Sequence, residues 1–239
     1  MNRQTEITML KQYNDKFVIE YGVDEVARGC LLGRVYAAAV VWKHPSEHPD
    51  IADSPLDLPK GIVIRDSKTM SKAQRERADK WIREHAYAVA ISYKDEVYID
   101  AHNILQSAHD AMADAIRTVS FDIRSREKHD DNIVNHVLVD GNRFNPSEPL
   151  DIYHSCIVKG DNKYISIACA AIVAKVAHDD YITQLCKNHP ILHTNYDLLN
   201  NMGYGTKKHM LGIQAHGISN LHRKSFSCCQ NQKETIDII

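Results

Sequence analysis

The 239-residue sequence has no apolar run near the roughly 20 residues that a membrane-spanning helix needs. Its opening stretch, MNRQTEITMLKQYNDKF, contains neither the apolar core nor the small-residue cleavage site of a secretory signal. We therefore expect an intracellular protein that is neither secreted nor inserted into a membrane.

Cysteine and histidine motifs are also missing. The six cysteines form no C-x-x-C pair, and the 14 histidines form no H-E-x-x-H pattern. Cys169 lies in an apolar run, where a small hydrophobic side chain is sufficient. We expect free thiols in a reducing compartment, not disulfides or a zinc site.

An excess of charge of one sign is absent as well. The chain has 29 Lys and Arg against 31 Asp and Glu, a formal net charge of −2. This balance argues against a polycation that holds nucleic acid by bulk electrostatics, although it does not exclude a local basic face. With 44% hydrophobic and 25% charged residues and no internal repeat, the sequence predicts one large globular domain, or one domain with an appendage.

The apolar pattern predicts a mixed α/β sheet covered by helices. Short runs rich in β-branched and aromatic residues indicate strands, and the short link between the first two favours an antiparallel pair. Spacings of three and four indicate helices, and Ser71 is a suitable N-cap. Four of the seven prolines lie in residues 43–61, which predicts a loop. The predicted strands are 17–26, 35–42, 86–93, 137–140 and 156–158, and the predicted helices are 71–85, 100–119 and 165–185.

Four acidic residues stand at or just beyond the ends of predicted strands. Asp24 and Glu25 end the first strand, Asp140 ends VLVD, and Asp161 follows the short strand in CIVKGD. Carboxylates that meet at one edge of a sheet suit Mg²⁺ or Mn²⁺. Two such ions can activate water and stabilise the leaving oxygen in phosphodiester hydrolysis.

Simpler interpretations remain open for each acid alone. Asp140 with Gly141 is typical of a hairpin turn, and Asp161 in KGDN is typical of an ordinary turn. Neighbouring Asp24 and Glu25 point to opposite faces of a regular strand, so at most one of them would be a direct ligand.

The segments that surround these acids carry a family resemblance. They are GVDEVARGCLLGRVYAAAVV, RDSKTMS, ILQSAHDAM after Asn103, VLVDGN, VKGD, SIACAAIVAKVAHD, MGYGTKKH and HRKSF. In content and order they resemble the ribonuclease HII (type 2 ribonuclease H) family, from about Val18 to Phe226. The resemblance implies an α/β fold with an RNase H-like mixed β-sheet flanked by helices and a C-terminal helical region. It divides the chain into a catalytic core at 17–190 and a substrate-holding helical region at 191–226. Residues 227–239 match no family motif, and we expect a flexible tail there.

The resemblance also implies an activity. Asp24, Glu25, Asp140 and Asp161 match the family's four metal-binding catalytic acids, which hold two divalent ions, Mg²⁺ or Mn²⁺. Family members hydrolyse the RNA strand of RNA–DNA hybrids and cut 5′ to ribonucleotides embedded in DNA, leaving 5′-phosphate and 3′-hydroxyl ends. They commonly work as monomers, so we expect a monomer, and the sequence leaves any protein partner unknown.

Substrate contacts follow from the same resemblance. Ala27, Arg28 and Gly29 match the family's GRG motif, which with Tyr204 reads the ribose 2′-hydroxyl, and Lys68 matches a phosphate contact. Residues 203–226 carry four basic side chains and no acidic one, a formal +4. These candidate phosphate contacts are Lys207, Lys208, Arg223 and Lys224.

Four positions depart from the family pattern. Ala27 replaces a glycine, Cys30 a proline, Ala171 a serine and His178 an arginine. A methyl group at position 27 narrows the approach of a ligand and adds strain if the backbone there has positive φ. Two alternatives therefore stand beside the family activity, an RNase H-fold nuclease with another substrate and a non-catalytic hybrid-binding module. The four intact acids count against the second.

Overall fold

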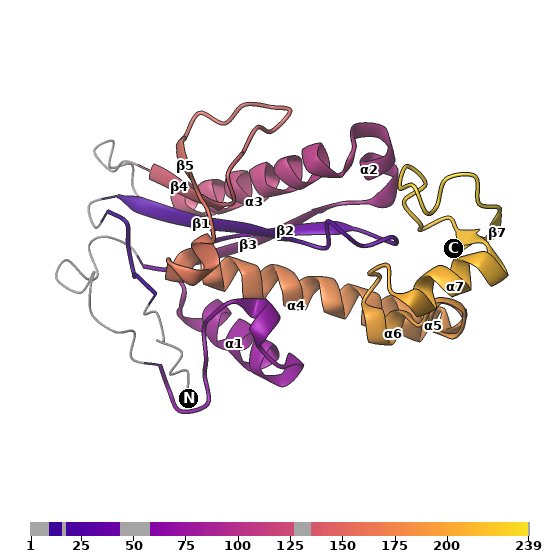
Figure 1. Ribbon diagram of the computed structural model, residues 1–239. Helices are drawn as coiled ribbons and strands as arrows, with labels where there is room; N and C mark the ends of the chain where they lie inside the picture. Colours follow the sequence, from indigo (N-terminus) through magenta and orange to yellow (C-terminus); the bar gives the residue numbers. More distant parts are fainter. Residues whose placement is uncertain (1–9, 16–17, 44–57, 127–134, 239) are drawn as a thin grey trace, which may run out of the picture.

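A five-stranded mixed sheet forms the centre of the fold (Figure 1). Its order is β3-β2-β1-β4-β5, with β1–β2 and β2–β3 antiparallel and β1–β4 and β4–β5 parallel. The antiparallel pairing of the first two strands confirms the sequence prediction. The strands are β1 (Ile19–Val26), β2 (Val35–Val41), β3 (Ala88–Lys94), β4 (Asn135–Asp140) and β5 (Tyr153–Ile157).

The computed structural model describes residues 10–15, 18–43, 58–126 and 135–238. Most of the predicted proline-containing loop, at 44–57, lies outside these residues, as does residue 17 at the predicted start of the first strand. In the described part of the chain no helix is long and apolar enough to cross a membrane. All six cysteines lie in this part and are free thiols, as predicted.

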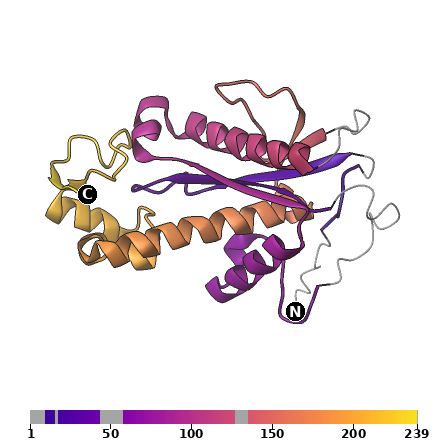
Figure 2. The same ribbon diagram turned by 180° about the vertical axis from the view of Figure 1, so that it is seen from behind.

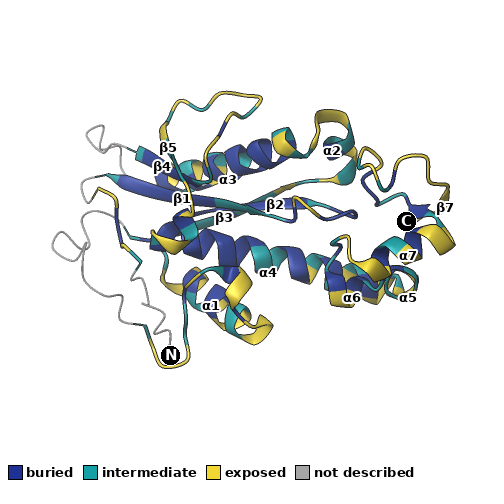
Figure 3. Cartoon of the chain, viewed as in Figure 1, coloured by how far each residue is buried: buried dark blue, intermediate teal, exposed yellow. Residues whose placement is uncertain are grey.

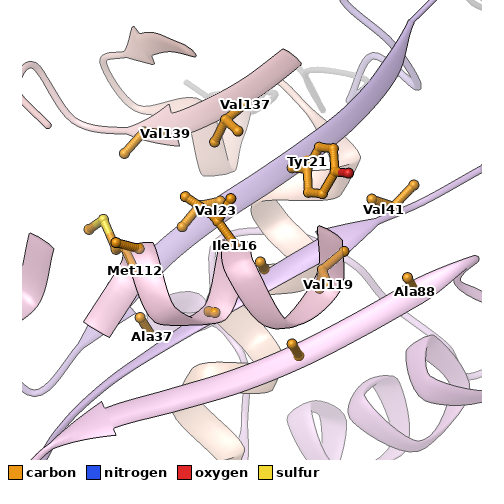
Figure 4. Packing of buried hydrophobic residues seen from close by; sticks show 14 of the residues in the cluster. Tyr21, Val23, Ala37, Val41, Ala88, Met112, Ile116, Val119, Val137 and Val139 are labelled. Carbon is orange, nitrogen blue, oxygen red and sulfur yellow. The ribbon is translucent and has the colours of Figure 1, made fainter. Parts of the chain in front are cut away.

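Helices cover both faces of the sheet, which confirms the predicted α/β class (Figures 1 and 2). On one face α3 (Ile104–Arg126) covers the sheet, with Ile116 beside Val23 and Val119 toward Val41 and Ala88 in the same core (Figure 4). On the other face lie α4 (Ile165–Asn188) and α1 (Lys72–His85). Their apolar residues share a second core with alternate residues of β2, so β2 and most of β1 are buried from both sides (Figure 3).

Local capping explains where two of the helices begin. Ser71 caps α1, and a reciprocal pair of hydrogen bonds with Gln74 completes a capping box, which confirms the predicted N-cap. The predicted single helix at 100–119 is wrong, because the chain forms α2 (Glu96–His102) and then α3. Asn103 separates them with φ of 62°, and its side chain accepts the first free N–H groups of α3.

The C-terminal region has a core of its own. It comprises α5 (Pro190–Tyr196), α6 (Leu198–Asn201), α7 (Lys207–His216), β6 (Ile218–Ser219) and β7 (Glu234–Ile236). Leu31 and Leu32, from the turn between β1 and β2, are buried in this core, so the turn packs against the C-terminal region. The helix α4 runs from under the sheet into the same region (Figure 1).

Residues 227–238 differ from the flexible tail that the sequence predicts for 227–239. β7 pairs in parallel with β6, and Cys229 is buried in the C-terminal core. The Asn220 side chain also hydrogen-bonds Asp237 and Ile238. This order depends on contacts with residues 216–220, which no local pattern in the segment reveals.

Candidate active site

A pocket of about 360 Å³ opens where the end of β1 meets α4. Three of its side chains are predicted metal ligands, Asp24, Glu25 and Asp161. The remaining described residues that line it are Val26, Ser67, Lys68, Arg75, Ala171, Lys175 and Tyr204. Two of the predicted substrate contacts, Lys68 and Tyr204, therefore share a cavity with three of the predicted acids.

Gly22 explains why Asp24 lies against α4. A Cβ atom built at Gly22 would stand 2.1 Å from the carbonyl carbon of Ser166 and 2.3 Å from the nitrogen of Ile167. The strand and the first turn of α4 are thus in direct backbone contact. Because residues two apart share a face of a strand, Asp24 points toward the same helix.

The two acids of β1 are close enough to influence each other's ionisation. Burial, and then the charges of Glu25 and Asp140, raise the pKa of Asp24 well above its usual range. Burial also raises the pKa of Glu25, an effect opposed by Arg28, whose Nη1 donates to Glu25 Oε1 at 2.9 Å. Like charges are therefore concentrated at this end of β1, and Arg28 offsets one of them.

Asp140 and Asp161 approach from the strands on the other side of β1. The parallel register pairs Val23 with Val139, so Asp140 stands beside Asp24. The Gly160 N–H donates to Asp140 Oδ1 at 2.7 Å, which fixes the 3-10 turn that carries Asp161. Burial, then the charges of Asp140 and Asp66, raise the pKa of Asp161. Asp140 ends one of two parallel strands and is not part of a hairpin turn, whereas Asp161 does lie in a turn.

The donor set fits a hard divalent cation. Carboxylate oxygens are the ligands that Mg²⁺ and Mn²⁺ prefer, and desolvated acids beside other acids are costly without a counter-charge. Within the described residues no group of three or more His, Cys, Asp or Glu side chains already stands in position to hold a metal. The four acids interact electrostatically, and binding an ion would have to draw them closer.

Arg75 and Lys175 are pocket residues that the sequence analysis missed. Arg75 donates to the carbonyl of Met70 at 2.6 Å, and so holds the turn that carries Lys68. It also contacts Asp179 Oδ2 at 3.3 Å, while Lys175 Nζ donates to Asp179 Oδ1 at 2.7 Å. The available signal for Lys175 was a lysine directly after the small and apolar run SIACAAIVA.

The structure brings the GRG-like segment and Tyr204 together. Cys30 pairs with Tyr204 in an antiparallel bridge, and the Leu31 N–H donates to the Gly203 carbonyl at 2.8 Å. Burial raises the pKa of the Tyr204 hydroxyl, and a hydrogen bond with the backbone of Ala27 opposes this effect. Ala27 has φ of 72° and is 2% exposed, so alanine here occupies a conformation that favours glycine.

Two of the residues that the sequence resemblance marks as departures from the family contact each other. Cys30 Sγ lies 3.8 Å from His178 Nε2, and the His178 ring packs edge-on to Tyr204. A third departure, Ala171, lines the pocket directly. The departures therefore gather around the proposed ribose-reading residues.

The expectation that Arg223 holds a phosphate is wrong, because Arg223 is fully buried and bonded to backbone carbonyls. The other three candidates lie on the surface. Lys208 forms an ion pair with Asp197, and Lys224 forms one with Glu234. Lys207 is exposed in the first turn of α7, with no ion pair to another described residue.

Comparison with known proteins finds relatives that cover most of the chain. The family model described as Ribonuclease HII matches residues 21–229. Ribonuclease HII of Bacteroides thetaiotaomicron is 39% identical over 219 residues, covering 92% of this chain and 94% of the relative. That of Parabacteroides distasonis is 38% identical, covering 94% and 98%.

Solved structures share the fold. Bst-RNase HIII in complex with Mn²⁺ aligns with a TM-score of 0.64 at 16% identity, covering 90% of this chain and 68% of that one. The ribonuclease H2 of Pyrococcus horikoshii OT3 aligns with a TM-score of 0.59 at 18% identity, covering 88% and 95%.

Proposed function

The chain belongs to the ribonuclease HII family and is a type 2 ribonuclease H, an endoribonuclease, and we propose that it cuts the RNA strand of RNA–DNA hybrids and the 5′ side of ribonucleotides embedded in DNA. The products would carry 5′-phosphate and 3′-hydroxyl ends. The observation that carries this proposal is that Asp24, Glu25 and Asp161 share one pocket with Tyr204. Such an enzyme would act wherever the genome is replicated.

We assign the metal sites to Asp24, Glu25, Asp140 and Asp161. The raised pKa of Asp24 supports a requirement for Mg²⁺ or Mn²⁺, because the charged side chains that act on it are the acids Glu25, Asp140 and Asp161, whereas Arg28 pairs with Glu25. Two such ions, when bound, activate water and stabilise the leaving oxygen. The carboxylates orient the site around the scissile phosphate, and Lys68 and Lys175, which line the pocket, offset phosphate charge.

We assign recognition of the 2′-hydroxyl to Tyr204 and the backbone of Ala27, Arg28 and Gly29. A Cβ built at Gly29 would stand 3.9 Å from the Tyr204 ring, so this segment and the ring form one surface. Only a ribonucleotide offers a hydroxyl there as both donor and acceptor. Lys207, exposed on α7, would contact a phosphate farther along the duplex.

One cleavage assay tests the proposal. We would incubate the full chain with a DNA duplex containing one ribonucleotide, an RNA–DNA hybrid and an all-DNA duplex, each with Mg²⁺, Mn²⁺ or EDTA. We expect metal-dependent cleavage of the first two substrates. Cleavage of the all-DNA duplex would contradict the proposed specificity, and binding without cleavage under every metal condition would favour a non-catalytic hybrid-binding module.

Asp140→Asn tests the assignment of the acids. We expect at least a hundredfold loss of cleavage with an unchanged fold, because the amide oxygen can still accept the Gly160 N–H. Asp151→Asn, the same change at an exposed acid, is the matched control. Retained activity in Asp140→Asn would remove Asp140 from the metal site.

A further inference from the structure

Two neighbouring residues of the C-terminal region, His222 and Arg223, are fully buried and reach two different segments. His222 Nε2 lies 3.2 Å from His209 Nε2, and His209 Nδ1 lies 3.1 Å from the Tyr204 carbonyl oxygen. The Ser219 N–H donates to His222 Nδ1 at 2.9 Å. A chain of hydrogen bonds therefore connects Ser219 to Tyr204.

The donors and acceptors assign each ring nitrogen in this chain. A carbonyl oxygen can only accept, so His209 Nδ1 carries a proton and donates to Tyr204. His222 Nδ1 accepts from Ser219, so His222 carries its proton on Nε2 and donates it to His209 Nε2. Both histidines are then neutral and every ring nitrogen is satisfied. Burial favours this state, since it lowers the pKa of His209 and lowers that of His222 to about 3.

Arg223 holds the turn between β1 and β2. Its guanidinium donates to three backbone carbonyls, those of Arg28, Gly33 and Arg34, at 2.9 to 3.0 Å. Its own N–H donates to the Leu31 carbonyl at 2.9 Å. A lysine has one nitrogen and cannot reproduce this planar set of contacts.

We propose that His222 and Arg223 form a positioning unit that sets the spacing between Tyr204 and the Ala27–Gly29 segment, and so determines how well the enzyme distinguishes ribose from deoxyribose. One residue anchors Tyr204 through His209, and the next anchors the turn through the carbonyl of Arg28. Neither is among the described residues that line the pocket. The inference rests on the proposed ribose-reading role of these two segments.

Binding without cleavage isolates this effect. In an Asp140→Asn background with Mg²⁺, we would measure Kd for a DNA duplex with one ribonucleotide and for the all-DNA duplex of the same sequence. We expect His222→Asn to reduce the ratio of the two affinities about tenfold, because its short amide satisfies Ser219 but cannot reach His209. His222→Gln restores a donor near the Nε2 position, and should recover most of the ratio.

Two further variants complete the test. Arg223→Lys should lower the same ratio, since it releases the turn at Arg28. His216→Asn, the same chemical change at an exposed histidine of α7, is the control and should leave the ratio unchanged. If His222→Asn does not fold, His209→Gln decides, because it keeps an acceptor for His222 but removes the donor to Tyr204.

The outcomes distinguish a failure of the proposed ribose recognition from a failure of the positioning unit. A parent protein that binds both duplexes equally would overturn the proposed ribose recognition, and this inference with it. The parent protein can instead prefer the ribonucleotide duplex while the variants keep the same preference or lose affinity equally for both duplexes. That result would overturn the positioning unit alone.

Discussion

Ala27→Gly is the substitution for which the structure and the family pattern make the sharpest joint prediction. Ala27 has φ of 72°, and its methyl group is buried beside the proposed ribose-reading surface. Glycine would relieve the backbone strain and restore the close approach of a ligand. The change therefore tests both the conformation of this segment and its role.

The free energy of unfolding should change little, because three terms nearly cancel. Relief of the left-handed conformation stabilises the native state by about 1–2 kcal/mol. Removal of a buried methyl group costs about 0.8 kcal/mol, and the greater freedom of glycine in the unfolded chain costs about 0.4–1 kcal/mol. The sum lies within about 1 kcal/mol of zero.

Urea unfolding and cleavage kinetics measure the two effects separately. We expect the free energy of unfolding to stay within about 1 kcal/mol of the wild-type value. We also expect the ratio of kcat/KM on the single-ribonucleotide duplex to kcat/KM on the long hybrid to rise. Ala27→Val is the contrasting variant, since a β-branched residue at this φ should destabilise by at least about 2 kcal/mol. A stable Val variant would refute the positive φ, and an unchanged kinetic ratio in the Gly variant would show that the methyl group is tolerated.

Three other changes have distinct expected results. Gly22→Ala should lower the free energy of unfolding by about 3 kcal/mol or more in urea unfolding, because the added Cβ meets the backbone of α4. At Gly29 an added Cβ makes only ordinary contacts, so Gly29→Ala should leave the stability unchanged. Equal stability of the two variants would contradict the close packing at Gly22. Burial raises the pKa of Glu20 to about 7 from 4.5, so the folded state keeps a proton that the unfolded state loses. The free energy of unfolding of the wild type, relative to that of Glu20→Gln, should therefore fall by about 3 kcal/mol as pH rises from 4.5 to 7. Urea unfolding at both pH values measures this change. A difference that does not depend on pH would be evidence against the raised pKa. Lys207→Ala should weaken the binding of every duplex by a similar factor. It should also reduce the slope of log K against log salt concentration by about 1. An unchanged slope in a salt titration would exclude a phosphate contact.

The parts of the fold that were predictable are those determined locally. The capping box of Ser71 and the apolar spacing of α1 are encoded in adjacent residues. The short link between β1 and β2 similarly favours antiparallel pairing. The break at Asn103 was missed because the apolar spacing around it looks continuous, while a single residue with positive φ divides the helix.

Long-range contacts account for the other differences. The burial of Arg223 depends on a segment far away in the chain, and β7 pairs with β6 across an irregular stretch that has no hairpin signal. From sequence, a basic residue beside other basic residues suggests a surface contact. Only the folded chain reveals that the carbonyls of Arg28, Gly33 and Arg34 converge on this guanidinium.

The two neighbouring acids of β1 show what the alternation of side chains along a strand leaves out. By register, Asp24 and Glu25 do point to opposite faces of β1, as the sequence predicts for a regular strand. Yet both line the pocket. In the described sheet the β1–β4 ladder ends at Val23 and β4 itself ends at Asp140, so the cavity lies at the end of this strand pair, where acids from both faces of β1 reach it.

The formal charge of −2 conceals how a polyanionic duplex can be bound. Of the four basic residues in 203–226, Arg223 lies in the interior, which leaves three lysines for phosphates. The pocket itself holds acids that repel a phosphate. On the proposed assignment, four carboxylates and two divalent ions sum to zero, and adding four positive charges takes the chain from −2 to +2. The divalent ions then belong to the binding surface as well as to the chemistry, so the charge of the chain alone is a poor guide to its partner.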